Sequence, residues 1–105
     1  MAVKVSVTES DGAKTLTIGV TGRLDIYSYG EFSAAYKDHI GECAKTVIDM
    51  SELEYIDSSA LGMLLMLRER AGGAQAAIEI VNCSPAVRKI LATVKFDKLF
   101  GITPG

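Results

Sequence analysis

Two runs in which apolar and polar residues alternate open this sequence, and they constrain its fold more than any other feature. Valines alternate with Lys, Ser and Thr over residues 3–8, and Leu, Ile and Val alternate with Thr and Gly over residues 15–21. A period of two is typical of a β-strand with one buried face. The pair Asp11-Gly12 between the runs favours a tight turn. The sequence therefore predicts a β-hairpin.

After the hairpin, helical and strand patterns alternate along the chain. Ser28 and Glu31 form a capping-box pattern ahead of apolar residues at helical spacing, with Gly41 as the stop, and Pro85 suits the first turn of a later helix. The order β-β-α-β-α-β-α predicts an α/β fold of one domain: a β-hairpin followed by right-handed βα units, with about four strands in a mixed sheet and helices mainly on one face. The elements predicted after the hairpin are helices over 29–40, 57–71 and 85–94, strands over 46–50 and 76–81, a connection over 51–56, a short terminal helix over 96–100 and a tail over 103–105.

The charge balance and the apolar pattern favour a soluble protein. The 105 residues carry a net charge of −2, so a basic surplus that could contact phosphates is absent and nucleic-acid binding has little electrostatic support. The longest apolar stretch, residues 60–67, is far shorter than the roughly 20 residues that a membrane span needs. The N-terminus lacks the pattern of a secretory signal. We therefore expect a cytoplasmic protein that binds neither nucleic acid nor membrane.

The two cysteines and the single histidine indicate neither a disulfide nor a metal site. Cys43 precedes one predicted strand and Cys83 follows the next parallel strand, which places them at opposite ends of the sheet. Without an export signal, both thiols are expected to be reduced. One histidine and two distant cysteines form no ligand cluster, and we expect no cofactor.

Polar loops follow the second and third predicted strands. Residues 22–25 form the first loop, and Asp57, Ser58 and Ser59 end the second. In parallel α/β sheets, functional groups gather where strands end and helices begin. Because both loops belong to the same edge of the sheet, Asp25 should lie near Ser58.

Ser58 falls at the start of a predicted helix. Free backbone N–H groups and the helix dipole favour an anion there, and a phosphate would add roughly −1.5 to −2 of charge at neutral pH. Next to Asp57 and near Asp25, that charge would repel a partner. The simpler interpretation is that Asp57, Ser58 and Ser59 only cap the helix.

The outer face of the same helix is apolar and small rather than charged over its first two turns. Two explanations are open: the terminal helix covers this face, or the face is a partner-binding patch beside the serines, for which methionines are well suited. With Leu61 as the inward reference at about 100° per residue, the inward residues are Leu64, Leu65 and Leu67, and the outward residues are Ser59, Gly62 and Met66, with Met63 at the border.

Four segments together resemble one family. Residues 57–62, Asp-Ser-Ser-Ala-Leu-Gly, resemble the D-S-[ST]-G-L-G signature of anti-sigma-factor antagonists with the STAS fold. Residues 22–25, Gly-Arg-Leu-Asp, resemble the G-x-L-D that follows the family's second strand. Residues 47–51 resemble its strand into the D-L-S turn, and residues 82–87 resemble its S-P-x-V helix start. The match runs through nearly the whole chain in order and spacing, so residues 1–105 resemble a single STAS domain.

The resemblance implies a phosphorylation switch and its partners. By this resemblance Ser58 is the phosphoacceptor, and the unphosphorylated form binds an anti-sigma factor that is also a serine kinase of the histidine-kinase-like ATPase type. Phosphorylation ends the binding, and a PP2C-type phosphatase restores it. ATP would belong to the kinase, because this chain has no P-loop or kinase motif and is not expected to be an enzyme. Ala60 stands where the family usually has Gly, and the expected partner-binding residues are Asp25, Asp57, Ser59, Ala60, Gly62, Met63 and Met66.

Two other functions compete with the switch. A non-phosphorylated STAS subunit of a phospholipid-transport complex would use Ser58 only as a helix cap. A serine hydrolase is a weaker alternative, because residues 57–61 are not a G-x-S-x-G elbow and the only histidine, His39, falls on the apolar stripe of the first predicted helix.

Overall fold

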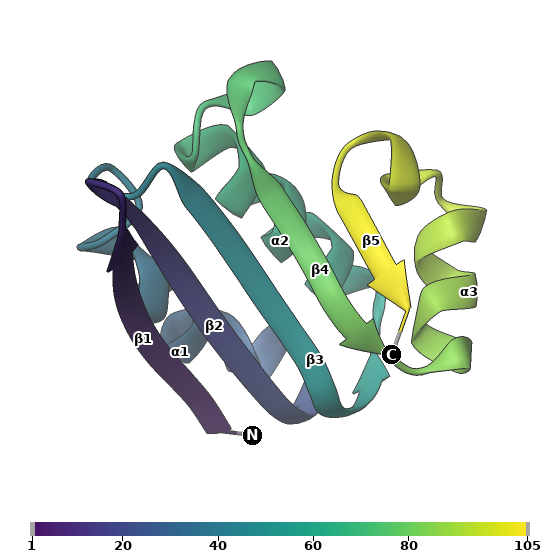
Figure 1. Cartoon of the computed structure of the whole chain (residues 1–105). Helices are drawn as coiled ribbons and strands as arrows, with labels where there is room; N and C mark the ends of the chain where they lie inside the picture. The colour runs from purple at the N-terminus through teal and green to yellow at the C-terminus, as the bar shows by residue number, and fades with distance from the viewer. Residues whose placement is uncertain (1, 105) are drawn as a thin grey trace.

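The computed structural model describes residues 2–104, whose strands form one five-stranded sheet in the order of the chain, β1-β2-β3-β4-β5 (Figure 1). β1 runs antiparallel to β2, and every later pair of neighbours is parallel. The predicted fold class is confirmed, with five strands instead of about four. The strands are β1 (Ala2–Ser10), β2 (Ala13–Leu24), β3 (Lys45–Ile56), β4 (Ile78–Cys83) and β5 (Gly101–Pro104).

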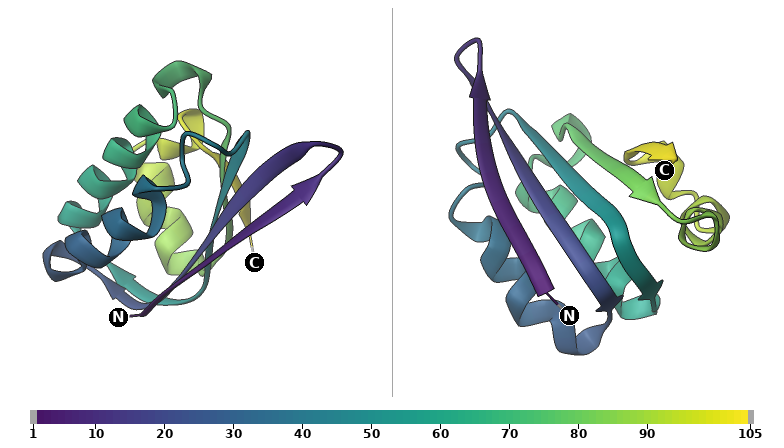
Figure 2. Two further views of the ribbon diagram at one scale, coloured as in Figure 1. Left: turned by 90° about the vertical axis from the view of Figure 1, so that its left-hand side faces the viewer. Right: turned by 60° about the horizontal axis from the view of Figure 1, so that its bottom comes forward.

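The three α-helices of the described residues lie on one side of the sheet, and the other side is open to solvent (Figure 2, left). Each helix crosses from one parallel strand to the next, and crossovers of one hand that always advance in one direction place their helices on one face. The helices are α1 (Tyr29–Lys37), α2 (Ser58–Arg70) and α3 (Pro85–Thr93), with short 3₁₀-helices η1 (Ile26–Ser28), η2 (Gly73–Gln75) and η3 (Phe96–Lys98).

The core lies between the helices and the three central strands. Leu16 and Ile18 of β2, Ile48 of β3 and Ile80 of β4 are fully buried, and so is Leu64 of α2. Their strand positions are the apolar half of each alternation, so burial follows the period of two in the sequence.

The predicted hairpin is confirmed, and its turn has the expected chemistry. Asp11 and Gly12 both have positive φ angles, of 52° and 81°. Two positive φ angles define the type I′ turn, whose twist matches that of the flanking strands. Beyond the turn β1 and β2 pair without a break, from Ser10 opposite Ala13 to Ala2 opposite Thr21.

The third strand is longer than predicted, because residues 51–56 continue β3 instead of forming a connection. Its pairing with β2 shifts register twice, between Gly19 and Thr21 and again between Gly22 and Arg23. At each shift β3 carries one residue more than β2, as in a β-bulge. The bulges change the burial of β3 from every second residue to every third, at Leu53 and Ile56, and this change conceals the strand in the sequence.

Other element boundaries also differ from the sequence predictions. The first helix ends at Lys37 instead of residue 40, and β4 begins and ends two residues later than predicted. The terminal helix is reduced to η3, and Thr103 and Pro104 belong to β5, which pairs with β4. This four-residue strand contains one glycine and one proline and has no alternation that could reveal it. Gly105 of the predicted tail lies outside the described residues.

Candidate functional site

The two polar loops meet at one edge of the sheet, as predicted. Leu24, the last residue of β2, pairs with Ile56, the last residue of β3. The backbone N–H of Asp57 donates to the carbonyl of Leu24 at 3.3 Å, so the pairing continues into the loops. Asp25 and Asp57, which directly follow the ends of these neighbouring strands, therefore lie side by side.

Asp57 is the N-cap of α2. Its backbone is extended, with φ −117° and ψ −175°, and its Oδ1 accepts a hydrogen bond from the N–H of Ala60 at 3.2 Å. This geometry satisfies one of the free N–H groups of the first helical turn. Ser58 follows as the first helical residue and is exposed, whereas Ser59 is half-buried.

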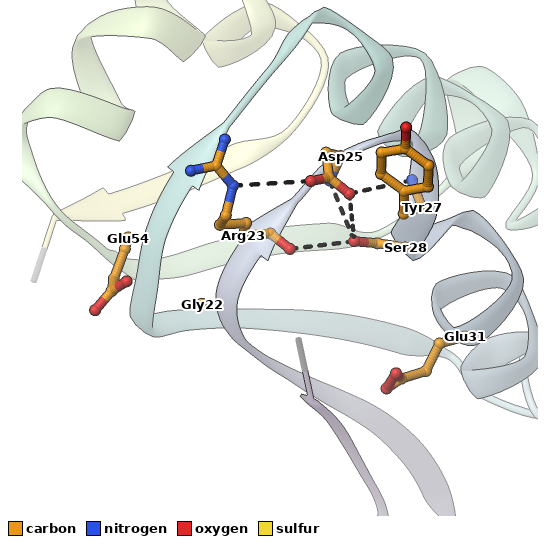
Figure 3. A pocket seen from close by; sticks show the side chains of 7 residues that line it. All are labelled: Gly22, Arg23, Asp25, Tyr27, Ser28, Glu31 and Glu54. Carbon is orange, nitrogen blue, oxygen red and sulfur yellow. Dashed lines mark hydrogen bonds and ion pairs between the residues drawn. The ribbon is translucent and has the colours of Figure 1, made fainter.

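Asp25 has the same role at η1. Its Oδ1 accepts from the N–H of Tyr27 at 3.1 Å, and its own N–H donates to the Oγ of Ser28 at 3.2 Å, which completes a capping box (Figure 3). The predicted capping box of Ser28 with Glu31 is wrong, because Ser28 makes no side-chain cap on α1. The buried Ser28 hydroxyl is instead held within 3.1 Å of the Arg23 carbonyl and 3.2 Å of Asp25 Oδ1. β2 extends to Leu24, and Asp25 is therefore the first residue free to cap.

An open hollow of about 470 Å³ lies beside Asp25, between the end of β2 and the start of α1 (Figure 3). Arg23 lies above it, with its Nε 3.8 Å from Asp25 Oδ2 and its guanidinium 4.4 Å from the centre of the Tyr55 ring. The Arg23 side chain is mostly exposed, and an exposed pair at this distance is a weak constraint. The lining residues are Gly22, Arg23, Asp25, Tyr27, Ser28, Glu31 and Glu54.

Exposed apolar side chains surround the start of α2 and the neighbouring loop. Tyr27 is 93% exposed, Ile26 59% and Tyr55 43%, and these residues follow or end β2 and β3 at the same edge as Ser58. Side chains of this size exposed together are typical of a surface that contacts another protein. Ile26 and Tyr55 were not among the predicted site residues, because apolar residues near strand ends are more often buried.

The predicted orientation of α2 needs a correction. Ala60 is fully buried and Met63 is 4% exposed, so neither can face a partner in this structure. Leu65, expected inside, is 39% exposed, whereas Met66 is 40% exposed as predicted and Gly62 is exposed too. The centre of the buried face of α2 consists of Ala60, Leu64 and Leu67. Leu61, which was the inward reference of the prediction, is only half-buried.

The outer face of α2 is not covered by the C-terminal segment. That segment packs elsewhere: η3 contacts α3 and β5, and β5 pairs with β4 at the sheet edge. The explanation in which a terminal helix shields Met66 is therefore wrong. Gly62, Leu65 and Met66 remain at the surface beside Ser58 and Ser59.

The histidine cannot serve Ser58 as a general base. His39 follows the end of α1 and precedes β3, whereas Ser58 follows the last residue of β3. A strand of 12 residues, rising about 3.3 Å per residue, separates the two along the sheet. The Ser-His pair that a serine hydrolase requires is therefore not formed.

Within residues 2–104, no three His, Cys, Asp or Glu side chains are grouped as metal ligands would be. Cys43 is half-buried and Cys83 buried, and both are free thiols. No helix in the described part of the chain is long and apolar enough to cross a membrane.

Comparisons with known proteins place the chain in a family. The family model described as "Mlab, STAS domain" matches residues 7–103. A STAS-domain containing protein of Pseudomonas aeruginosa (strain UCBPP-PA14) is 43% identical over 99 residues, which cover 94% of this chain and 98% of that protein. The chain belongs to the STAS domain family.

Solved structures share the fold at lower identity. The anti-sigma factor antagonist SpoIIAA in its unphosphorylated form has a TM-score of 0.74 at 20% identity, over 99% of this chain and 89% of that chain. The Bacillus cell fate determinant SpoIIAA in its phosphorylated form has a TM-score of 0.70 at 20% identity, over 96% and 90%. An anti-sigma factor antagonist from Mycobacterium paratuberculosis has a TM-score of 0.76 at 23% identity, over 99% and 87%.

Proposed function

We propose that this chain is a phosphorylation-controlled anti-sigma factor antagonist. In its unphosphorylated form it binds an anti-sigma factor that is also a serine kinase of the histidine-kinase-like ATPase type, and phosphorylation of Ser58 releases it. A PP2C-type phosphatase would restore the binding form. The observation that carries the proposal is an exposed serine directly after the capping Asp57, beside exposed apolar side chains. The proposed partner surface consists of Asp25, Asp57, Ser59, Gly62 and Met66 around Ser58.

The capping geometry explains how a phosphate could act without moving the fold. Asp57 already accepts the N–H of Ala60, so part of the positive end of α2 is neutralised by the protein's own carboxylate. A phosphate on Ser58 would bring roughly two further negative charges to an exposed position. Asp57 is negative as well, and Asp25 is paired only weakly with the mostly exposed Arg23, at 3.8 Å, so the added charge would repel a partner that covers this edge.

The first test modifies the proposed acceptor. We expect protein purified from its own cells to carry phosphate on Ser58 in part of the population, as mapped by phosphopeptide mass spectrometry. Ser58→Ala should bind the cognate anti-sigma factor as wild type does, and Ser58→Asp should bind at least about tenfold more weakly, a loss of about 1.4 kcal/mol. Ser59→Ala is the matched control and should still carry the phosphate on Ser58. Absence of phosphate under every growth condition, together with wild-type binding by Ser58→Asp, would refute the switch.

The second test concerns the outer face of α2. Met66→Glu places a charge on a side chain that is 40% exposed, so we expect it to weaken binding to the anti-sigma factor by at least about tenfold while the urea unfolding midpoint stays the same. Isothermal titration calorimetry measures the affinity. Ala92→Glu on the exposed side of α3 is the control and should bind normally. Unchanged affinity of Met66→Glu would remove this face from the partner surface.

The capping geometry also fits a second function, a non-phosphorylated STAS subunit of a phospholipid-transport complex. Asp57 alone holds the N–H of Ala60, and α2 needs no modification at Ser58 in order to begin. Copurification with a transport ATPase, with Ser58 unmodified, would favour this alternative over the switch.

A further inference from the structure

The sheet has one long unpaired edge. Within residues 2–104, the nine-residue strand β1 pairs only with β2, so the backbone groups on its outer side have no strand partner. The hairpin also reaches beyond the helix layer (Figure 2, right). As a result Val5 is 40% and Val7 41% exposed, although they point to the same side as the buried Ile18 and Leu16 with which they pair. Long apolar edges of this kind are templates for a further strand.

The opposite edge cannot take that strand. β5 has only four residues and ends at Pro104, which has no backbone N–H to donate. A head-to-tail contact between β1 of one copy and β5 of the next would therefore form few hydrogen bonds. The partner that fits β1 best within a population of identical chains is β1 itself.

We propose that β1 pairs with β1 of a second copy, antiparallel, around a two-fold axis at Ser6. The two sheets then become one continuous sheet, and the interface is isologous and closed. On the helix side Val5 faces Val7 of the other copy, so these four valines shield one another, and the partly buried Val3 faces Glu9 at each end of the pairing. On the open side Lys4 faces Thr8 and Ser6 faces its own counterpart, and no like charges are opposed.

Neighbouring registers are less favourable, and this selects Ser6 as the centre. The register centred on Ser6 pairs the whole of β1, residues 2–10. A register centred on Val7 would pair only residues 4–10 and would place Val5, which is more exposed than Val3, opposite Glu9. A register centred on Val5 would shorten the overlap and make the two Lys4 side chains diagonal neighbours on the open side. A shift of a single residue would put valines of one copy opposite polar residues of the other.

The surface is separate from the candidate partner site. β2 and β3 lie between the free edge of β1 and the loop of Asp57 and Ser58. The dimer would therefore leave α2 uncovered in both copies and present two such sites on one particle.

Charges at Ser6 test the proposal, because this exposed residue would meet itself at the axis. We expect the wild-type chain to show a concentration-dependent monomer–dimer equilibrium in sedimentation velocity, between micromolar and millimolar protein. Ser6→Lys and Ser6→Asp should each raise the dimer dissociation constant at least tenfold, and an equimolar mixture of the two variants should recover the dimer. Ala92→Lys adds the same charge to an exposed position of α3 and should dimerise as wild type does. Urea unfolding of each variant checks that the fold is intact.

Three results would overturn the proposal. A wild-type chain that stays monomeric at every concentration would show that β1 does not pair with itself, and a strand of another protein would then be the partner to test. Wild-type dimerisation by Ser6→Lys would place the contact elsewhere on the molecule. Failure of the mixed variants to associate would exclude a two-fold axis at Ser6.

Discussion

At the scale of single residues, Asp49 links two strands on the open side of the sheet. Its Oδ1 accepts from the N–H of Ser51 at 2.9 Å and from the side-chain amide of Asn82 at 3.3 Å. Partial burial raises the pKa of Asp49, but the hydrogen bonds from Ser51 and Asn82 outweigh it, so the pKa is lowered overall. A carboxylate with a lowered pKa in the folded state stabilises the fold above its unfolded-state pKa. That stabilisation is lost as the pH falls through the folded pKa.

The Asn82→Gly variant tests this link. Asn82 has a φ of 60°, which glycine adopts without strain, so the change removes the amide donor and keeps the backbone. We expect the pKa of Asp49, measured by carbon-13 NMR titration, to rise toward its ordinary value. The stability lost between neutral and acidic pH should then be smaller than in wild type. Asp49→Asn, which cannot titrate, is the control, and an unchanged Asp49 pKa in Asn82→Gly would contradict the hydrogen-bond explanation.

At the scale of elements, α2 contributes both to the hydrophobic core and to the candidate site. Its inner line is fully buried at Ala60, Leu64 and Leu67, and its outer side carries Gly62 and Met66. The two small residues have opposite environments: a side chain at position 60 lies against the core, whereas an added Cβ at Gly62 would meet no atom within 4 Å. Ala60 and Gly62 therefore form a matched pair for measuring how a side chain on the inner side and one on the outer side of α2 affect the stability of the fold.

Substitution of these two positions should change stability in opposite directions. Ala60→Gly loses a buried methyl group and the helix propensity of alanine, so it should lower the free energy of unfolding by about 1–2 kcal/mol. Gly62→Ala gains propensity without a clash and should raise it by about 0.5–1 kcal/mol. Urea denaturation of the full chain measures both. A stabilising Ala60→Gly would mean that the first turn of α2 is strained by its methyl group.

The elements with strong periodicity could be predicted from the sequence, and those with broken periodicity could not. The alternation of valines, and of Leu16 with Ile18, predicted the hairpin and its turn. The second half of β3 was missed because two bulges bury Leu53 and Ile56 at a spacing of three. β5 was missed because four residues with a glycine and a proline carry no pattern.

At the candidate site, the sequence predicted which loops meet but not how α2 is rotated. The order of parallel strands alone brings Asp25 and Asp57 to one edge. The rotation of α2 buries Ala60 and Met63 and exposes Leu65, and it depends on packing against the sheet that a helical wheel does not contain. Ser28 was assigned to the wrong cap because two overlapping capping-box patterns share it, and the end of β2 selects Asp25.

At the scale of the whole molecule, stability should be uneven across the sheet. The central strands β2 and β3 are paired on both sides and covered by helices, whereas the hairpin tip around Asp11 and Gly12 is paired on one side only and exposed (Figure 2, right). Local opening requires little free energy where few apolar contacts are lost.

Amide hydrogen exchange should report this gradient directly. The most protected amides of β2 and β3 should exchange at least about a thousandfold more slowly than those of residues 9–13, because the former open only with global unfolding. The measurement belongs at protein concentrations below those at which the chain associates. Equal protection at the hairpin tip and in the central strands would show that the tip is held by contacts beyond β1 and β2.

Because the strands lie in the sheet in the order in which they occur along the chain, assembly can proceed in one direction. Every new strand docks against the one synthesised just before it, and no later segment must be inserted between two that have already paired. A chain emerging from the ribosome can thus form its hairpin first. It can then add each helix and the strand that follows it to the sheet edge formed by the preceding strand. The topology that places the helices in one layer therefore also allows the sheet to fold strand by strand in the order of synthesis.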